Sequence, residues 1–155
     1  MISEERIIRS EKIYEGKVVS LSCHTVELDG QRYGKREVVE HAGGCTMVAL
    51  CEDGKIPFVK QYRIATKKYL LELPAGLIEH NENPMKAAIR ELAEETGLVA
   101  ESAEFLLEAY TSPGFTNEKI HIFYCENPTP GEMHLDETED LEVVYMDLNE
   151  ALRMI

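Results

Sequence analysis

One stretch, residues 83–97, constrains the fold more than any other, because it contains the beginning, the packing face and the end of a helix. Asn83 is a favourable N-cap, and Pro84 suits the first helical position. Gly97 provides a stop signal at the other end. The apolar groups that fall on one helical face are Met85, Ala88, Ile89, Leu92 and the methyl of Thr96. We therefore expect an amphipathic helix over residues 84–96 that packs against a core.

Elsewhere, short apolar runs separated by turn residues indicate strands. The pairs Asp29-Gly30 and Asp53-Gly54 each lie between two such runs and predict β-hairpins. The expected strands are residues 18–28, 32–40, 45–51, 56–62, 69–73, 103–110, 120–125 and 141–146. Many strands with one clear helix favour a mixed α/β (α+β) fold in which helices cover a mixed β-sheet. The first hairpin predicts an N-terminal antiparallel arrangement.

The domain organisation is expected to be simple. The 155 residues contain no repeat and no linker-like segment, so a single domain over residues 1–155 is expected. A second helix is expected after Asp147, where Leu148, Ala151, Leu152 and Ile155 have helical spacing. Because that pattern is still running at Ile155, we expect the natural chain to continue beyond it.

Composition narrows the class of protein. The net charge of −13 argues against nucleic-acid binding, since the phosphate backbone would be repelled. No apolar run is long enough to span a bilayer, and residues 1–12 lack a signal-peptide core, so a cytoplasmic location without membrane association is expected. The four cysteines show neither CxxC spacing nor nearby histidine pairs and are expected to be small apolar residues in strands.

The end of the clear helix carries an unusual concentration of negative charge. Glu91 and Glu95 lie about 40° apart on the helical circumference, and Glu94 lies on the same side. Like charges at this spacing repel, and anions near a helix C-terminus oppose the macrodipole by roughly 0.3–1 kcal/mol each. A bound Mg²⁺ or Mn²⁺ would turn both penalties into attraction, whereas a solvated acidic face is the alternative. Gly76, after an apolar strand, would let the backbone turn sharply and direct carbonyls at the ion.

From Gly76 to Leu98 the chain reads GLIEHNENPMKAAIRELAEETGL. This segment resembles the Nudix box at every fixed position: Gly, five residues, Glu, seven residues, then Arg-Glu-Leu-x-Glu-Glu-x-Gly-Leu. The resemblance implies the Nudix fold, a mixed β-sheet sandwiched between helices. It also implies that Glu91 and Glu95 are metal ligands, that Glu94 assists them, and that the carbonyl of Ala75 completes the site.

The same resemblance implies supporting roles for two further residues of the box. Arg90 and Glu82 are expected to form an ion pair that holds the loop against the helix. In that position Arg90 would orient the catalytic carboxylates.

Beyond the box, the chain resembles the ADP-ribose pyrophosphatase branch of the family. The resemblance rests on residues 112–118 (SPGFTNE), on residues 60–63 and 71–76, and on residues 16–18 and 35–39. Pro113 stands fifteen residues after the box, where that branch keeps a characteristic proline. The resemblance implies that Arg63 contacts the substrate phosphates, that Arg36 reaches substrate in the neighbouring subunit, and that Glu118 lines the ribose side. Pro113 would border the substrate or serve as a rigid turn.

The acidic run at residues 135–140 precedes an expected strand. In the branch that the chain resembles, a loop here supplies a glutamate that polarises the attacking water. Glu139 aligns best with that role and Glu137 is the second choice. A plain solvated loop remains the alternative.

The resemblance therefore implies Mg²⁺-dependent hydrolysis of ADP-ribose, or of a related nucleoside diphosphate sugar, to AMP and ribose 5-phosphate. Mn²⁺ could replace Mg²⁺. It also implies a homodimer in which residues 1–40 make subunit contacts. Two alternatives remain within the family: hydrolysis of another nucleoside diphosphate derivative, or a non-catalytic module that binds ADP-ribose. A third, an acidic interaction domain, does not explain the spacing of the box.

Overall fold

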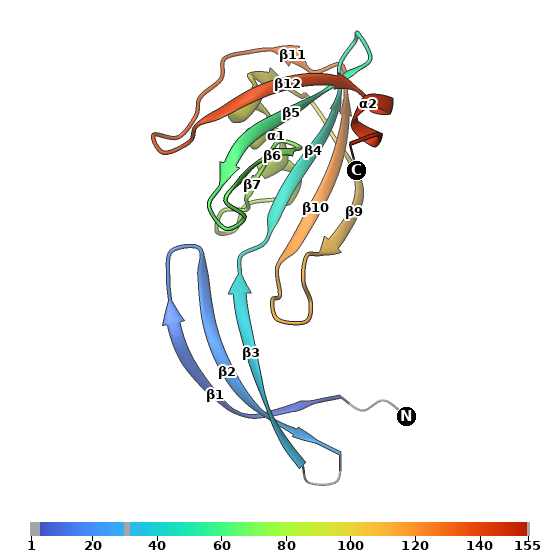
Figure 1. The fold of residues 1–155 in the computed structure, drawn as a ribbon. Helices are drawn as coiled ribbons and strands as arrows, with labels where there is room; N and C mark the ends of the chain where they lie inside the picture. The colour runs from blue at the N-terminus through green and yellow to red at the C-terminus, as the bar shows by residue number, and fades with distance from the viewer. Residues whose placement is uncertain (1–3, 30–31, 155) are drawn as a thin grey trace. The chain divides into compact units, whose positions relative to one another are not determined.

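The computed structural model describes residues 4–29 and 32–154 and divides into two compact units. The first, here called the N-terminal unit, comprises residues up to 43 together with residues 109–119. The second, the helical unit, comprises residues 44–108 and the residues from 120 onward. Figure 1 shows the elements of both units.

The N-terminal unit is built on a three-stranded antiparallel sheet of order β1-β2-β3. Its strands are β1 (Arg6–Glu15), β2 (Val19–Leu28) and β3 (Arg32–His41), drawn in blue to cyan in Figure 1. The β2–β3 hairpin confirms the expected pairing, while Gly30 of the expected Asp29-Gly30 turn lies outside the described residues. The strand β1 was not expected. All ten of its residues are exposed, so β1 has no buried face. Its sequence therefore lacks the alternation of apolar and polar residues that identifies a half-buried strand.

The helical unit contains a mixed sheet of order β7-β4-β10-β9. In it β4 (Gly44–Leu50) runs parallel to β10 (Lys119–Glu126) and antiparallel to β7 (Ala75–Leu77), and β9 (Glu104–Tyr110) forms the other edge. A second sheet has the order β12-β5-β6, with β12 (Leu141–Asp147), β5 (Lys55–Arg63) and β6 (Lys68–Glu72) all antiparallel. A short pair joins β8 (Leu98–Val99) to β11 (Thr129–Pro130). The parallel pairing of β4 with β10 confirms a mixed sheet and the α+β class.

Helix α1 (Pro84–Thr96) has the bounds that its sequence predicts. The Asn83 side chain accepts hydrogen bonds from the backbone N–H groups of Met85 and Lys86, and Gly97 ends the helix with φ of 69°. The core that the helix covers consists of Ala87, Ala88 and Leu92 against Cys45, Met47, Ala49, Phe123 and Cys125. Full burial of a leucine side chain such as Leu92 contributes about 1.5–3 kcal/mol, so packing rather than propensity fixes α1 on the sheet.

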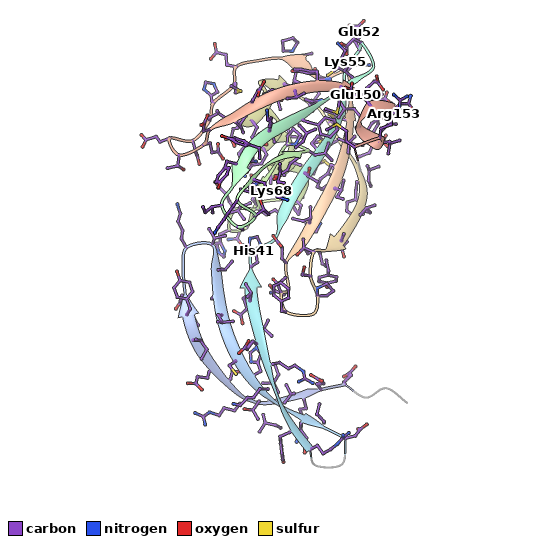
Figure 2. All side chains as sticks on the ribbon, viewed as in Figure 1. His41, Glu52, Lys55, Lys68, Glu150 and Arg153 are labelled. Atoms are coloured by element: carbon purple, nitrogen blue, oxygen red, sulfur yellow. The ribbon has the colours of Figure 1, made fainter. Side chains whose placement is uncertain are left out.

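The second helix is shorter than its pattern suggested. Helix α2 covers only Leu148–Leu152, with Asp147 as its N-cap, and Figure 2 labels Glu150 and Arg153 there. Ile155, the last residue of the expected pattern, lies outside the described residues. The short elements β7, β8 and β11 also went unpredicted, because two or three residues carry no periodicity. Among the described residues, no helix is both long and apolar enough to cross a membrane.

Candidate active site

The best-buried carboxylate of the helical unit is Glu95, in the last turn of α1. Its side chain is only 3% exposed, and its Oε2 accepts a hydrogen bond of 2.9 Å from the backbone N–H of Ala75. Burial raises the pKa of Glu95 to about 7, and the negative charges of Glu91 and Glu139 act in the same direction. The charged form of this carboxylate therefore lacks a strong counter-charge, as expected of a group that serves a cation.

Gly76 has a different function from the one expected. It lies within β7, paired with Cys45, rather than at a sharp turn, and it is not among the described glycines with positive φ. A Cβ atom at this position would overlap the carboxylate of Glu91. The Glu91 carboxylate therefore lies directly against the backbone at Gly76, and a side chain at position 76 would displace it. Burial raises the pKa of Glu91 as well.

Arg90 contacts three carboxylates at once. Its Nε and Nη2 donate to the two oxygens of Glu82 at 3.0 and 2.9 Å. Its Nη1 donates to Glu91 Oε1 at 2.7 Å and to Glu94 Oε2 at 2.8 Å. The structure thus has the ion pair expected with Glu82, and it adds two direct contacts to the acidic end of α1 that the sequence did not indicate.

Glu82 also holds the loop that precedes α1. Its Oε2 accepts a hydrogen bond of 3.0 Å from the backbone N–H of Glu79, and its own N–H donates to the carbonyl of Glu79. The hydrogen bonds from Arg90 lower the pKa of Glu82, so this carboxylate stays charged. The loop and the helix are consequently tied together through Glu82 and Arg90.

Arg63 lies at the end of β5, and Figure 2 labels Lys68, its partner in the β5–β6 register. Its guanidinium forms a two-bond fork with Glu72, at 2.9 and 2.6 Å. The charges of Glu95 and Glu139 also contribute to raising the pKa of Arg63. Sequence reasoning missed Glu72 as the partner, although a glutamate within the apolar run of β6 was a usable signal.

The structure distinguishes between the two glutamates of the acidic loop. The charge of Glu139 acts on Glu91, Glu95 and Arg63. Glu139 Oε2 also accepts a hydrogen bond of 3.0 Å from the backbone N–H of Asp136, which holds the loop turn. Glu137 is not among the largest influences on the pKa values of these three groups.

The donor set suits a hard divalent cation. Glu91, Glu94, Glu95 and Glu139 offer only carboxylate oxygens, the ligands that Mg²⁺ and Mn²⁺ prefer. The pKa of Glu95 is raised mainly by burial and further by the charges of Glu91 and Glu139, and a bound cation would favour the charged form. Among the residues that the structure describes, however, no three acidic, histidine or cysteine side chains already converge on a metal position. The carboxylates fit the metal chemically, while two of them are engaged with Arg90.

The remaining expected substrate residues lie in the N-terminal unit. Arg36 forms a fork with Glu5, and both line a cavity of about 480 Å³ together with Pro113 and Phe115. Glu118 Oε2 accepts a hydrogen bond of 2.6 Å from the Thr111 hydroxyl. The partners Glu5 and Thr111 were not identified from the sequence. Roles for Arg36, Pro113 and Glu118 in substrate binding stay predictions.

The family model for the NUDIX domain matches residues 41–155. The chain belongs to the Nudix family. Over 154 residues it is 40% identical to the ADP-ribose pyrophosphatase of Bacillus subtilis (strain 168). The match covers 98% of this chain and 83% of that protein. It is equally similar, with the same coverage, to the methanol dehydrogenase activator of Bacillus methanolicus.

A solved structure confirms the Nudix fold. The crystal structure of an ADP compounds hydrolase superposes with a TM-score of 0.86 and covers 99% of this chain and 84% of that one. Its sequence identity of 22% limits the comparison to the fold. Within this Nudix domain, β7 and α1 bring Ala75, Gly76, Glu91 and Glu95 together.

Proposed function

We propose that this Nudix protein hydrolyses ADP-ribose to AMP and ribose 5-phosphate with Mg²⁺ as its cofactor and Mn²⁺ as a substitute. The observation that carries the proposal is the group of carboxylates on α1 packed against Ala75 and Gly76, with the Arg63 cation close enough to act on Glu95. Negative groups that could hold cations beside a positive group that could hold phosphate suit cleavage of a diphosphate. The 40% identity to an ADP-ribose pyrophosphatase supports the choice of substrate.

In the proposed mechanism, Glu91, Glu95 and Glu94 would hold the metal, with the Ala75 carbonyl as a further ligand. When bound, Mg²⁺ would offset the charge that develops on the diphosphate oxygens. Arg63 would orient a phosphate through its guanidinium fork, exchanging part of its contact with Glu72. Glu139 would accept the proton of the attacking water, whose oxygen forms a bond to one phosphorus as the bridging P–O bond breaks.

Substrate recognition is proposed to extend to residues of the N-terminal unit. Arg36, Pro113 and Glu118 are the candidates, with Arg36 acting on substrate bound by a second subunit. This arrangement requires a homodimer formed through residues 1–40. The exposed faces of β1, including Ile7, Ile13 and Tyr14, support a contact surface there, because such apolar side chains gain from burial.

Two other activities are compatible with the family. Hydrolysis of a different nucleoside diphosphate derivative uses the same box, and the Bacillus methanolicus relative shows that proteins this similar bear other names. A non-catalytic ADP-ribose-binding module is disfavoured by the complete set Arg90, Glu91, Glu94 and Glu95, since binding alone does not require all three carboxylates.

The test is phosphate release from ADP-ribose in the presence of alkaline phosphatase, which acts on AMP and ribose 5-phosphate but not on the intact diphosphate. GDP-mannose, diadenosine polyphosphate and NADH serve as competing substrates at equal concentration. We expect Mg²⁺-dependent release that is greatest for ADP-ribose and reduced by orders of magnitude in Glu95→Gln. In EDTA, where AMP is measured directly by chromatography without the phosphatase, no AMP should form. Preference for another substrate would redirect the assignment within the family, and binding without release would favour the non-catalytic module.

A further inference from the structure

The guanidinium of Arg90 uses its separate edges for two different tasks. The edge formed by Nε and Nη2 is anchored on Glu82, and Nη2 also donates to the carbonyl of Leu77 at 3.2 Å. The other nitrogen, Nη1, donates to Glu91 and Glu94, at 2.7 and 2.8 Å. Only the first task is needed to tie the loop to the helix. The second places a positive charge on two of the proposed metal ligands.

The acidic end of α1 needs such a charge when no metal is bound. Glu91, Glu94 and Glu95 repel one another, and all three oppose the dipole at the C-terminal end of the helix. The last turn of α1 contains no basic residue. Arg63, the cation that acts on Glu95, is committed to Glu72 through two hydrogen bonds. Arg90 is thus the cation in direct contact with Glu91 and Glu94 among the described residues.

From this geometry we propose that Arg90 is a built-in counter-ion of the metal-free enzyme, which neutralises Glu91 and Glu94 until a divalent cation takes them over. The proposal rests on the metal site of the proposed function. Arg90 and the cation then compete for the same two carboxylates, so each weakens the binding of the other. The lack of a ready-made cluster of metal ligands among the described side chains agrees with this, because two of them face Nη1.

The anchor on Glu82 explains how Arg90 could release these carboxylates without leaving the site. Its two hydrogen bonds to Glu82 and the one to Leu77 do not involve Nη1. A small displacement of Nη1 would free Glu91 and Glu94 while the loop stays attached to the helix. Arg90 is therefore a positioning residue that acts through the carboxylates.

A purely structural Arg90 makes a different prediction. If its only function were to tie the loop to α1, its removal would lower the melting temperature by the same amount with and without metal. A counter-ion that competes with metal instead makes the metal-free protein the more sensitive state, since ligand binding stabilises the folded protein according to its affinity.

The experiment uses the full chain and compares wild type, Arg90→Gln and Glu82→Gln without substrate. Binding of Mn²⁺ is measured by electron paramagnetic resonance of the free ion, and melting temperatures are recorded in EDTA and in saturating Mn²⁺. We expect Arg90→Gln to bind Mn²⁺ at least about tenfold more tightly than wild type, because a repelling charge is removed. The rise in melting temperature caused by Mn²⁺ should be correspondingly larger. Glu82→Gln, which loosens the loop but keeps the Arg90 charge, should bind Mn²⁺ no more tightly than wild type.

Equal or weaker Mn²⁺ binding by Arg90→Gln, together with parallel losses of melting temperature in EDTA and Mn²⁺, would overturn the proposal. Folding of Arg90→Gln only in the presence of Mn²⁺ would support it. If that variant fails to fold in either condition, Arg90→Lys is used instead; because it keeps the positive charge it should bind Mn²⁺ about as tightly as wild type, and clearly tighter binding would overturn the proposal. Failure of wild type to bind Mn²⁺ in a Glu95-dependent manner would instead refute the metal site of the proposed function.

Discussion

The burial of the Glu95 carboxylate leads us to expect that Glu95→Gln, the substitution proposed to impair activity, makes the metal-free protein more stable than the wild type. In the metal-free protein the pKa of Glu95 rises from its ordinary value of 4.5 to about 7, mainly through burial. The folded protein therefore holds this proton more tightly than the unfolded chain does. The contribution to stability is fully present below pH 4.5, and it falls as the pH rises to about 7.

The size of this destabilisation follows from the shift in the pKa of Glu95. Each tenfold change in proton affinity corresponds to about 1.4 kcal/mol, so the charged Glu95 side chain destabilises the metal-free protein by about 3 kcal/mol at pH 8. The substitution Glu95→Gln removes the charge and keeps an oxygen that can accept the hydrogen bond from the Ala75 N–H. We expect the variant to exceed the wild type in free energy of unfolding by up to about 3 kcal/mol at pH 8, and by little at pH 4.5.

The assay is urea denaturation in EDTA at pH 8.0 and pH 4.5, followed by circular dichroism because the chain has no tryptophan. Glu137→Gln is the control, since it removes one carboxylate from an exposed loop position and should change stability by less than about 0.5 kcal/mol. A Glu95→Gln variant that is less stable than wild type at pH 8, or whose advantage does not depend on pH, would refute the reasoning. Saturating Mg²⁺ should remove most of the advantage by stabilising the wild type alone.

Three further predictions concern the site and its support. Gly76→Ala should impair activity because its Cβ displaces the Glu91 carboxylate, but it should change the free energy of unfolding by less than about 1 kcal/mol, since only the far end of a flexible side chain has to move; Gly114→Ala, with open space around it, should leave stability within about 0.5 kcal/mol in the same denaturation assay. Glu139→Gln should reduce kcat for ADP-ribose by about 10²–10⁴-fold while Glu137→Gln does not, and the reverse order in steady-state kinetics would transfer the role to Glu137. Leu92→Ala should cost about 2–5 kcal/mol in urea denaturation, since Leu92 is fully buried on the core-facing side of α1; a loss below about 1 kcal/mol would contradict that packing.

Local signals predicted the elements whose ends and faces are encoded in neighbouring residues. Helix α1 was predictable to the residue because its N-cap, proline, apolar face and terminal glycine all agree. The β2–β3 hairpin followed from turn residues between apolar runs. The hairpin expected around Asp53-Gly54 was wrong, because β4 and β5 follow one another through that turn but belong to different sheets. Strand β1 has no buried side to impose a pattern, so it became apparent only through its pairing with β2.

In the candidate site, too, local features were predictable from the sequence and tertiary contacts were not. The spacing of Glu91, Glu94 and Glu95 was readable because a helix converts sequence spacing into direction. Partners brought together by tertiary folding were not readable, such as Glu72 with Arg63, nine residues away, and Glu5 with Arg36, 31 residues away. For Gly76 the expected sharp turn was wrong, and its contact with a side chain fifteen positions later leaves no local trace in the sequence.

The contact between Gly76 and Glu91 also implies an order in which these two positions can change during evolution. While Glu91 keeps its long side chain, any residue larger than glycine at position 76 displaces the Glu91 carboxylate, whatever its own polarity. A shorter residue at position 91 removes that conflict. In lineages that abandon the chemistry, we therefore expect position 91 to change first and position 76 to drift only afterwards, so an intact glycine beside a lost glutamate would mark a recent loss.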